Sequence, residues 1–463
     1  MLNPDDTIVA LATPPGRGGI GIVRVSGSRA LEISRRIFCP REKGMWPARP
    51  RCLTLGYVHN RREEALDQVL AVFFPAPHSY TTQDVVEIQA HGSPALLRRI
   101  ELLYVSEGAR PAGPGEFTLR AFLGGRLSLS QAEAVAQLIQ SRSRQESRLA
   151  LASLKGGLNR RLHPLRESLL ALSARIEAWL DYPEEMAEPE TPVFRQDLRQ
   201  NLLAPVETLL HERQRGRVFQ EGALLLLCGR PNVGKSSLFN ALLGRERALV
   251  SDLPGTTRDG LEEEIFIKGL TCRLRDSAGL GQETPLGGRE KLACLGQTAT
   301  REILPQADLL LLLLDGSVPL NGEDEAVLKE SEAYKRLLVI TKADLPPAWS
   351  ARRSARFPEP LLEISVRQGD LLALEEAIYQ ILTEGQDEPL PNQVVVSARQ
   401  MRVLQEMESA LIQTGRLLEQ DPPAWELLAW ELQQALRLLG RLDGQGTPDE
   451  VLEEIFSAFC LGK

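Results

Sequence analysis

Apolar residues follow three different patterns as the chain is traced from its start. Up to about residue 122, short runs rich in Val, Ile and Phe alternate with Gly and Pro clusters, as at residues 19–25, 66–74 and 84–90. Runs of this length between turn-forming residues predict short strands. We therefore predict a compact α+β module over residues 1–122.

Helical spacing begins near Ser130. Ser130 and Glu133 match a capping box, and apolar residues then recur three and four positions apart, which is the spacing of one helix face. This pattern predicts a helical domain over residues 123–216. It returns from about Ser397 and predicts a second helical part over residues 385–463.

Between residues 217 and 384, unbroken runs of Leu, Ile and Val alternate with helical segments. The runs lie at residues 224–228, 309–314, 337–340 and 361–366. Parallel strands that are covered on both faces have such continuous apolar runs, so we predict an α/β domain here. Because the ends of a domain often lie close together, this domain can be inserted within the helical one.

The charge balance limits how the chain can bind nucleic acid. Among 463 residues, 54 Lys and Arg stand against 62 Asp and Glu, a formal net charge of −8. Overall electrostatic attraction is therefore excluded as the main means of binding RNA. Any contact with RNA needs a local basic patch or a partner protein.

The termini and cysteines indicate a cellular compartment. The first six residues include two acids and no apolar core, and the longest apolar run, residues 309–314, is far shorter than the roughly 20 residues that cross a bilayer. We expect a soluble, cytoplasmic protein without membrane contact. The cysteines form no C-x-x-C pair, which argues against disulfides and zinc and predicts mostly buried thiols. They are Cys39, Cys52, Cys228, Cys272, Cys294 and Cys460.

The strongest local motif is at residues 229–236. These residues match G-x-x-x-x-G-K-[ST] and lie between a predicted strand and a predicted helix. The glycines let backbone N–H groups turn toward phosphates, Lys235 reaches the β and γ oxygens, and the Ser236 hydroxyl ligates Mg²⁺. A chance glycine-rich turn would fit this pattern alone, but further nucleotide motifs follow in order.

Four such motifs follow, at residues 255–259, 276–279, 341–344 and 365–367. Thr257 can complete Mg²⁺ coordination only while the γ-phosphate is present, which predicts a switch loop. Asp276 would hold the metal through water, and the Gly279 N–H can face the γ-phosphate.

We assign base choice to Asp344. Its carboxylate can accept two hydrogen bonds, from N1–H and from the exocyclic amine of guanine. Adenine lacks this donor pair and would leave a buried Asp344 unpaired, so GTP is predicted over ATP. Alone, the T-K-x-D pattern also fits a helix-capping turn. Its place after the other motifs favours the nucleotide site.

In order and spacing these motifs resemble those of the translation-factor-related GTPases, and the whole chain resembles the tRNA modification GTPase family MnmE, also called TrmE. The resemblance covers nearly the full length, and it is carried by residues 6–10, 12–19, 110–118, 131–134 and 459–463. It implies a multidomain α/β and α+β protein. The implied parts are a tetrahydrofolate-binding-like N-terminal module, a helical domain and an inserted P-loop GTPase domain of the Ras-like α/β class.

The resemblance also implies a function. The family hydrolyses GTP and acts with a flavoprotein partner, MnmG (also called GidA). Together they add an aminomethyl-type group, carboxymethylaminomethyl or aminomethyl, at C5 of wobble uridine 34 in certain tRNAs. A folate such as 5-formyltetrahydrofolate is the implied one-carbon donor. We expect a homodimer through the N-terminal modules and a heterotetramer-type complex with the partner.

The implied folate pocket maps onto Arg24, Glu87, Arg126 and Lys463. Cations suit the folate glutamate tail, and a carboxylate suits the pterin donors. From the residues alone, Arg24 points either into a site or along a sheet edge, and Glu87 is either a ligand or a solvated strand residue. Arg126 stands where the family usually has a lysine, which changes the donor geometry. Cys460 either packs in the core or takes part in the chemistry.

The resemblance further implies K⁺ beside the phosphates, where it takes the charge-stabilising role of an arginine finger. The implied ligands are Asn232, Ser251, Leu253 and Thr256, and Asn232 alternatively caps its turn. Ser236 and Thr257 are the expected Mg²⁺ ligands. The full set of expected nucleotide-binding residues is Asn232, Val233, Gly234, Lys235, Ser236, Ser237, Ser251, Asp252, Leu253, Pro254, Gly255, Thr256, Thr257, Asp276, Ser277, Ala278, Gly279, Thr341, Lys342, Ala343, Asp344, Ser365, Val366 and Arg367.

Three positions of the predicted GTPase domain depart from the family. Ser277 replaces the usual Thr, and Thr341 replaces the usual Asn, each keeping a short polar group. Counted without gaps, the family's water-orienting Glu falls on Ala293, and Glu290 lies about one helical turn earlier. We take Glu290 as the candidate that orients water, with a solvated helix residue as the alternative. Expected catalytic residues are thus Glu290, Lys235 and Thr257.

Other functions fit part of this pattern. A ribosome-assembly GTPase switch would share the nucleotide motifs. It would also carry an RNA module, and neither a G-x-x-G loop in a KH pattern nor a basic extension stands out. A folate-binding protein with a vestigial GTPase is the third hypothesis. The leading hypothesis is a GTPase of tRNA modification.

Overall fold

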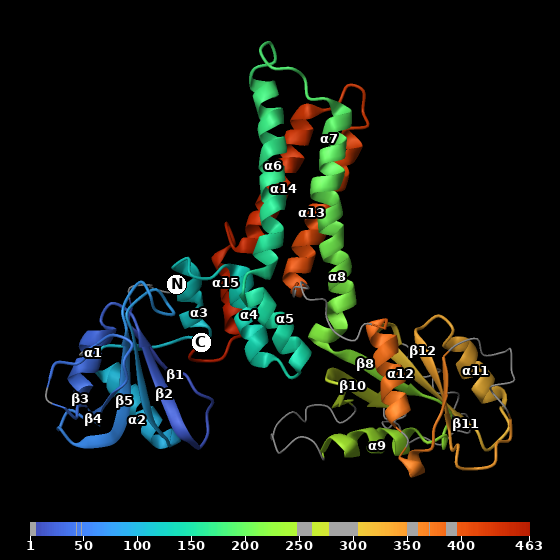
Figure 1. Ribbon diagram of the computed structural model, residues 1–463, viewed down its shortest axis with the longest axis horizontal. Coiled ribbons are helices and arrows are strands. Elements are labelled where there is room, and N and C mark those ends of the chain that lie inside the picture. The colour runs from blue at the N-terminus through green and yellow to red at the C-terminus, as the bar shows by residue number, and fades with distance from the viewer. Residues whose placement is uncertain are drawn as a thin grey trace, which may run out of the picture. The chain divides into compact units, whose positions relative to one another are not determined.

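The computed structural model describes residues 6–42, 44–47, 49–247, 262–276, 304–349, 360–369, 371–385 and 396–463. The chain forms two compact units (Figure 1). The first unit comprises residues 1–140, 150–210 and 396–463, and the second comprises residues 141–149 and 211–395. Helices α5 (Arg144–Leu154) and α8 (Ala204–Glu221) each contain a boundary between the units.

The N-terminal part of the first unit is a mixed sheet with helices packed on it, in keeping with the predicted α+β module. Its strand order is β3-β4-β5-β6-β2-β1-β7, and only the β1–β7 pair is parallel. Helix α2 packs closely on β2, because a Cβ at Gly21 would lie 2.2 Å from the Leu97 side chain. The elements are β1 (Ile8–Leu11), β2 (Gly18–Ser26), α1 (Ala30–Ile37), β3 (Phe38–Pro40), β4 (Thr54–His59), β5 (Ala65–Phe74), β6 (Val85–Gly92), α2 (Pro94–Ser106) and β7 (Arg110–Pro111).

The remainder of the first unit is helical, as predicted, and its two parts come from distant stretches of sequence. The long helix α14 packs along both α6 and α13 (Figure 1). Glu133 of α4 joins the parts, because it accepts hydrogen bonds from Arg399 and Gln400 at the start of α13. The elements are α3 (Glu116–Leu123), α4 (Leu129–Gln140), α6 (Gly157–Asp181), α7 (Thr191–Asp197), the π-helical η1 (Leu198–Leu203), α13 (Ala398–Leu417), α14 (Trp425–Asp443) and α15 (Asp449–Ser457).

One predicted helix start is wrong. The capping box of α4 is formed by Ser128 and Gln131, whose side chains each accept from the other's backbone N–H at 3.2 and 3.0 Å. Ser130 lies within the helix, and its hydroxyl instead donates to the Leu442 carbonyl at 2.9 Å. Two overlapping S-x-x-polar patterns occur here, Ser128 with Gln131 and Ser130 with Glu133. The second pair does not cap the helix, because Ser130 and Glu133 instead make contacts with distant segments. The Ser397 start of α13 is a capping box with Gln400.

The second unit is an α/β fold built on a largely parallel sheet, as the Leu-rich runs predict. Its strand order is β13-β12-β11-β8-β10-β9, and only β9 is antiparallel to its neighbour. Leu309, Leu311 and Leu313 pack on one face and Leu310 and Leu312 on the other. The elements are β8 (Ala223–Cys228), α9 (Lys235–Arg247), β9 (Glu262–Ile267), β10 (Leu270–Asp276), η3 (Leu304–Gln306), β11 (Leu309–Asp315), α11 (Gly322–Glu330), β12 (Arg336–Thr341), β13 (Leu361–Glu363), η5 (Val366–Gln368) and α12 (Leu372–Thr383).

Among the helices that the structure describes, none is both long and apolar enough to cross a bilayer.

Candidate functional site

The loop at residues 229–234 connects buried strand β8 to helix α9. Its backbone has positive φ at Gly229 (148°), Asn232 (64°) and Gly234 (107°). A Cβ at Gly229 would stand 2.6 Å from the Leu313 carbonyl oxygen, so only glycine fits. When residues with positive φ alternate with residues of negative φ, successive backbone N–H groups point to the same side. The loop then forms a concave surface that can bind an anion.

Lys235 begins α9 and closes this loop. Its side chain is buried, and Nζ donates to the carbonyls of Gly229 at 2.7 Å and Arg230 at 2.9 Å. The ammonium is therefore held inside the curve of the loop, where phosphate oxygens would meet it. Ser236 and Ser237 follow in the first turn of α9, and both are exposed.

The predicted base-recognition motif lies beside this loop at the carboxyl end of β12. Thr341 is buried, and its Oγ1 lies 2.6 Å from the Val233 oxygen and 3.2 Å from the Leu314 oxygen. The hydroxyl thus ties the motif to the phosphate loop. Lys342, at φ 61°, donates through Nζ to Asp315 Oδ2 at 2.6 Å. Asp315 was not predicted to contact this motif, although a carboxylate at the end of a buried Leu run could have indicated it.

Asp344 occupies the exposed side of the same motif. The Ser365 hydroxyl donates to Asp344 Oδ1 at 2.8 Å, and this hydrogen bond holds the pKa of Asp344 below its ordinary value. A buried Asp344 was expected from the sequence, whereas it is exposed here. One oxygen is therefore fixed by Ser365, and the carboxylate stays ionised and open to solvent. Val366 and Arg367 follow Ser365 in η5, and the Ala343 N–H donates to the Ile364 carbonyl at 3.1 Å.

Asp276 ends β10 on the other side of the loop. Its strand runs parallel to β8, and Asp276 is level with Leu227 near the end of that strand. It is therefore at the same sheet edge as the phosphate loop. Other expected residues lie outside the described part of the chain, namely Ser251, Asp252, Leu253, Pro254, Gly255, Thr256, Thr257, Ser277, Ala278, Gly279, Glu290 and Ala293.

A second constellation lies in the first unit, around Arg24. Arg24 of β2 and Glu87 of β6 are directly paired across the sheet, and their side chains meet at 2.8 Å with 17% and 16% exposure. The Arg24 guanidinium also donates to the Gly462 carbonyl at 3.3 Å. Arg24 therefore points toward Glu87 and Gly462 rather than along a sheet edge, and Glu87 is not a solvated strand residue.

Aromatic rings flank the same guanidinium. Arg24 lies 5.7 Å from the ring centres of both Tyr80 and Phe117, within cation–π range. The exposed Arg126 lies 5.6 Å from the centre of the Tyr80 ring and also donates to the Ser79 carbonyl. No role was predicted from the sequence for Tyr80 or Phe117. An aromatic residue in a polar loop was the only signal for Tyr80.

The last residues of the chain complete this constellation. The Phe117 N–H donates to the Lys463 main-chain oxygen at 3.2 Å. Gly462, at φ 87°, passes so close to β1 that a Cβ would stand 2.3 Å from the Leu11 oxygen. Burial and then the charge of Arg24 lower the pKa of Lys463, against the opposing charge of Glu87. We call Arg24, Glu87, Arg126 and Lys463, with Tyr80 and Phe117, the Arg24 cluster.

Cys460 lies beside the Arg24 cluster and is exposed. Among the described cysteines, Cys228 and Cys272 are buried, but Cys39, Cys52 and Cys460 are exposed. The expectation of mostly buried thiols is therefore wrong for these three. Cys460 does not pack in the core, although its neighbours Phe456 and Phe459 do, with ring centres 5.3 Å apart.

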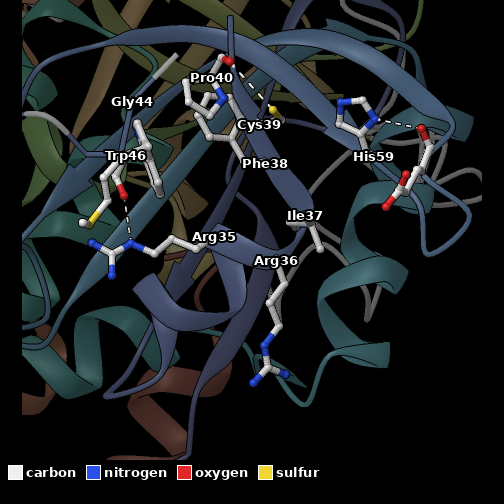
Figure 2. Close-up of a pocket in the computed structure, with 11 residues that line it drawn as sticks. Arg35, Arg36, Ile37, Phe38, Cys39, Pro40, Gly44, Trp46 and His59 are labelled. Carbon is white, nitrogen blue, oxygen red and sulfur yellow. Dashed lines mark hydrogen bonds between the residues drawn. The ribbon is translucent and has the colours of Figure 1, made fainter. Parts of the chain in front are cut away.

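A separate hollow of about 600 Å³ opens in the N-terminal part of the first unit. Figure 2 shows it between the end of α1, strand β3 and the loop at Trp46, where Arg35 Nε donates to the Trp46 carbonyl at 2.8 Å. None of the described residues expected to bind nucleotide or folate lines it. It therefore gives no support to either site.

Comparisons with known protein families match both the N-terminal part of the chain and the remainder. The family described as "GTP-binding protein TrmE N-terminus" matches residues 7–126, and the family described as "MnmE helical domain" matches residues 129–460.

Curated relatives match over the full length. The protein named tRNA modification GTPase MnmE from Synechococcus sp. (strain JA-3-3Ab) is 38% identical over 99% of this chain and 98% of the relative. The protein of that name from Moorella thermoacetica is 41% identical over 99% and 100% of the two chains. One from Thermus thermophilus is 41% identical over 100% of both. With its family matches and these full-length likenesses, the chain belongs to the MnmE family of tRNA modification GTPases.

Proposed function

We propose that this chain binds and hydrolyses GTP as the GTPase subunit of a tRNA-modifying enzyme. The observation that carries the nucleotide part is the contact of Thr341 Oγ1 with the Val233 oxygen at 2.6 Å. It joins the base motif to the phosphate loop, so that a nucleotide can reach both at once. Asp344, with its lowered pKa, then offers a charged double acceptor to guanine.

The residues at the phosphate end have separate tasks. Lys235 contributes positive charge to the β and γ oxygens, and the loop N–H groups hold the phosphates by their dipoles. The exposed Ser236 hydroxyl and Asp276 at the neighbouring strand end are hard oxygen donors that suit Mg²⁺. The exposed Asn232 side chain suits K⁺ in the same way. When bound, both cations would stabilise negative charge that develops on the phosphates.

We further propose a folate site at the Arg24 cluster. Arg24 and Lys463 offer cations to carboxylates of a folate tail, Glu87 offers an acceptor to pterin donors, and Tyr80 offers a flat face. Arg126 supplies a third cation at that ring. On this proposal a folate such as 5-formyltetrahydrofolate supplies the one-carbon unit.

The proposed product is an aminomethyl-type group, carboxymethylaminomethyl or aminomethyl, at C5 of wobble uridine 34. The proposed partner is the flavoprotein MnmG (GidA), and the chain is proposed to work as a homodimer in the cytoplasm. We also propose the domain division 1–122, 123–216, 217–384 and 385–463. The family membership and the two sites support this function over a ribosome-assembly GTPase switch.

The decisive experiment is nucleoside analysis of tRNA. Cells lacking this gene should lose the C5 group at wobble uridines, and the wild-type gene should restore it, whereas Lys235→Ala should not. Unchanged wobble uridines in the deletion strain would contradict the proposed function. A ribosome-assembly role would instead appear as accumulated ribosomal subunits with normal tRNA.

A further inference from the structure

A cavity of about 640 Å³ lies in the helical part of the first unit, away from the Arg24 cluster. Its walls come from α6 and from the last turns of α14, two helices that pack along each other (Figure 1). Helix α6 contributes Arg166 and Leu170, and α14 contributes Leu436, Arg437 and Arg441. The cavity thus combines three guanidinium groups with an apolar wall.

The three arginines differ in how they are engaged. Arg166 donates to Gln445 Oε1 at 3.1 Å and lies 3.8 Å from Asp443. Arg441 donates to Glu406 at 3.0 Å. Arg437 is exposed and makes no side-chain ion pair or hydrogen bond within the described residues.

The charge at the cavity is therefore positive. Three guanidinium groups line it, whereas the carboxylates of Asp443 and Glu406, which pair with two of them, are not among its lining residues. Leu170 is 53% exposed on the wall, so apolar surface is open beside the charges. An anion with a partly apolar body fits this combination better than a bare ion does.

The sequence around Arg166 strengthens this point. Residues 155–166 carry Lys155, Arg160, Arg161 and Arg166 and no acid, in a chain whose formal net charge is −8. Such a chain can bind RNA only through a local basic patch or a partner. Of these four cations, Arg166 lines the cavity, and with Arg437 and Arg441 it makes a local group of three cations there.

We propose that this cavity binds a backbone phosphate of the tRNA substrate. The arginines would hold the phosphate, and Leu170 and Leu436 would contact the adjoining sugar. Phosphate contacts position RNA without reading its sequence, so the site sets where the tRNA lies and not which tRNA is chosen. This inference rests on the proposed function in tRNA modification.

The test uses the full chain, fluorescently labelled unmodified tRNA, and polarisation titrations at several KCl concentrations. Arg437→Gln removes the guanidinium without breaking a described contact, so the fold is not at risk. It should weaken tRNA binding about fivefold to tenfold. This loss lies between the affinity contributed by an exposed ion pair and that contributed by a charge-assisted hydrogen bond. It should also reduce the salt slope of log K by about 1.

Arg416→Gln is the matched control. Arg416 is also an exposed helix arginine of the first unit, in the last turn of α13, and has no side-chain partner within the described residues. It does not line the cavity. Its substitution should leave tRNA affinity and the salt slope unchanged, and neither variant should change GTP hydrolysis measured without tRNA.

Several results would overturn the proposal. They are no tRNA binding by the wild-type chain, unchanged affinity in an Arg166→Gln, Arg437→Gln double variant, and equal losses in Arg437→Gln and Arg416→Gln. Inorganic pyrophosphate that displaces tRNA at micromolar concentration would also overturn it, because it would show a site for a free anion. Loss of the wobble modification in the deletion strain, with full tRNA binding by the double variant, would reject the cavity and leave the proposed function intact.

Discussion

The nucleotide site and the Arg24 cluster are built in opposite ways. The phosphate loop is contiguous in sequence, and its shape is encoded by residues with positive φ between β8 and α9. The Arg24 cluster collects single residues from β2, β6, the start of the helical part and the end of the chain. A contiguous site can be recognised from its own pattern, whereas a dispersed site exists only once the fold has formed.

The same difference predicts how each site fails. One residue closes the phosphate loop, so one substitution should destroy its function. In the Arg24 cluster several cations are proposed to bind the same folate, so each single substitution should lower the folate affinity only in part.

The largest expected effect is that of Lys235→Ala. Removing the ammonium that lies inside the loop should abolish tight GTP binding. Fluorescent-nucleotide titration measures this, with Lys329→Ala, an exposed lysine of α11, as the control. Folate binding should be unaffected. A variant that lost both ligands would show that the two sites are not independent.

Glu290→Ala should come next. If Glu290 orients the attacking water, kcat for GTP should fall by about 10²–10⁴ with nucleotide affinity nearly unchanged, the range for a positioned acid–base group. The assay is GTP hydrolysis in K⁺, where the wild type should also be faster than in Na⁺. An unaltered K⁺-stimulated rate would identify Glu290 as a solvated residue.

Asp344→Asn should have a smaller, selective effect. The amide no longer offers two acceptors to guanine, so the preference for GTP over ATP should drop by about 10²-fold, or roughly 2–3 kcal/mol. Competition of the two nucleotides for one labelled probe measures the ratio. Equal binding of GTP and ATP by the wild type would show that the assignment of Asp344 is wrong.

Lys463→Met tests the dispersed site. The methionine keeps the main-chain oxygen that binds Phe117 and removes only the cation, so affinity for 5-formyltetrahydrofolate should fall about tenfold with GTP binding intact. Calorimetry with the full chain measures both affinities. Deletion of residues 461–463 should cost more affinity, because it also removes the Gly462 carbonyl from Arg24. An unchanged folate affinity in both variants would refute the mapping.

The pH dependence of folate binding should show the smallest effect. Burial and Arg24 lower the pKa of Lys463, so its charge is lost at a lower pH than that of an ordinary lysine. Because the protonated amine binds the anion, affinity should fall as pH rises through this lowered pKa. Lys463→Arg stays charged over that range and should flatten the profile. The same slope in both proteins would assign the titration to another group.

The second unit was more predictable from the sequence than the first. Unbroken Leu runs predicted its parallel strands, because burial on both faces leaves no alternation. The phosphate loop was predicted from its spacing between a strand and a helix, and the Thr341 motif from its place after the other nucleotide motifs. The exposure of Asp344 and its bond to Ser365 were not, since they depend on how two loops meet.

In the first unit, contacts were harder to predict than elements. Arg24 and Glu87 each had two interpretations, because a charged residue in an alternating strand fits a site and a solvated face equally well. Only the pairing of β2 with β6 brings them together. The role of Tyr80 and the true cap of α4 at Ser128 likewise depend on contacts between distant segments.

The leucines of β11 have a consequence for how the protein is made. Leucine by itself favours helix over strand, so this segment has no local preference for its final form. It becomes a strand by pairing with β8 and β12, and Leu309 meets Leu225, which lies far earlier in the chain. Contacts between such distant residues form late. The folding rate of a newly synthesised second unit should therefore depend on how fast this leucine segment pairs with β8. Valine or isoleucine at Leu309 or Leu310, which lie outside the contacts with Gly229 and Thr341, should speed that step.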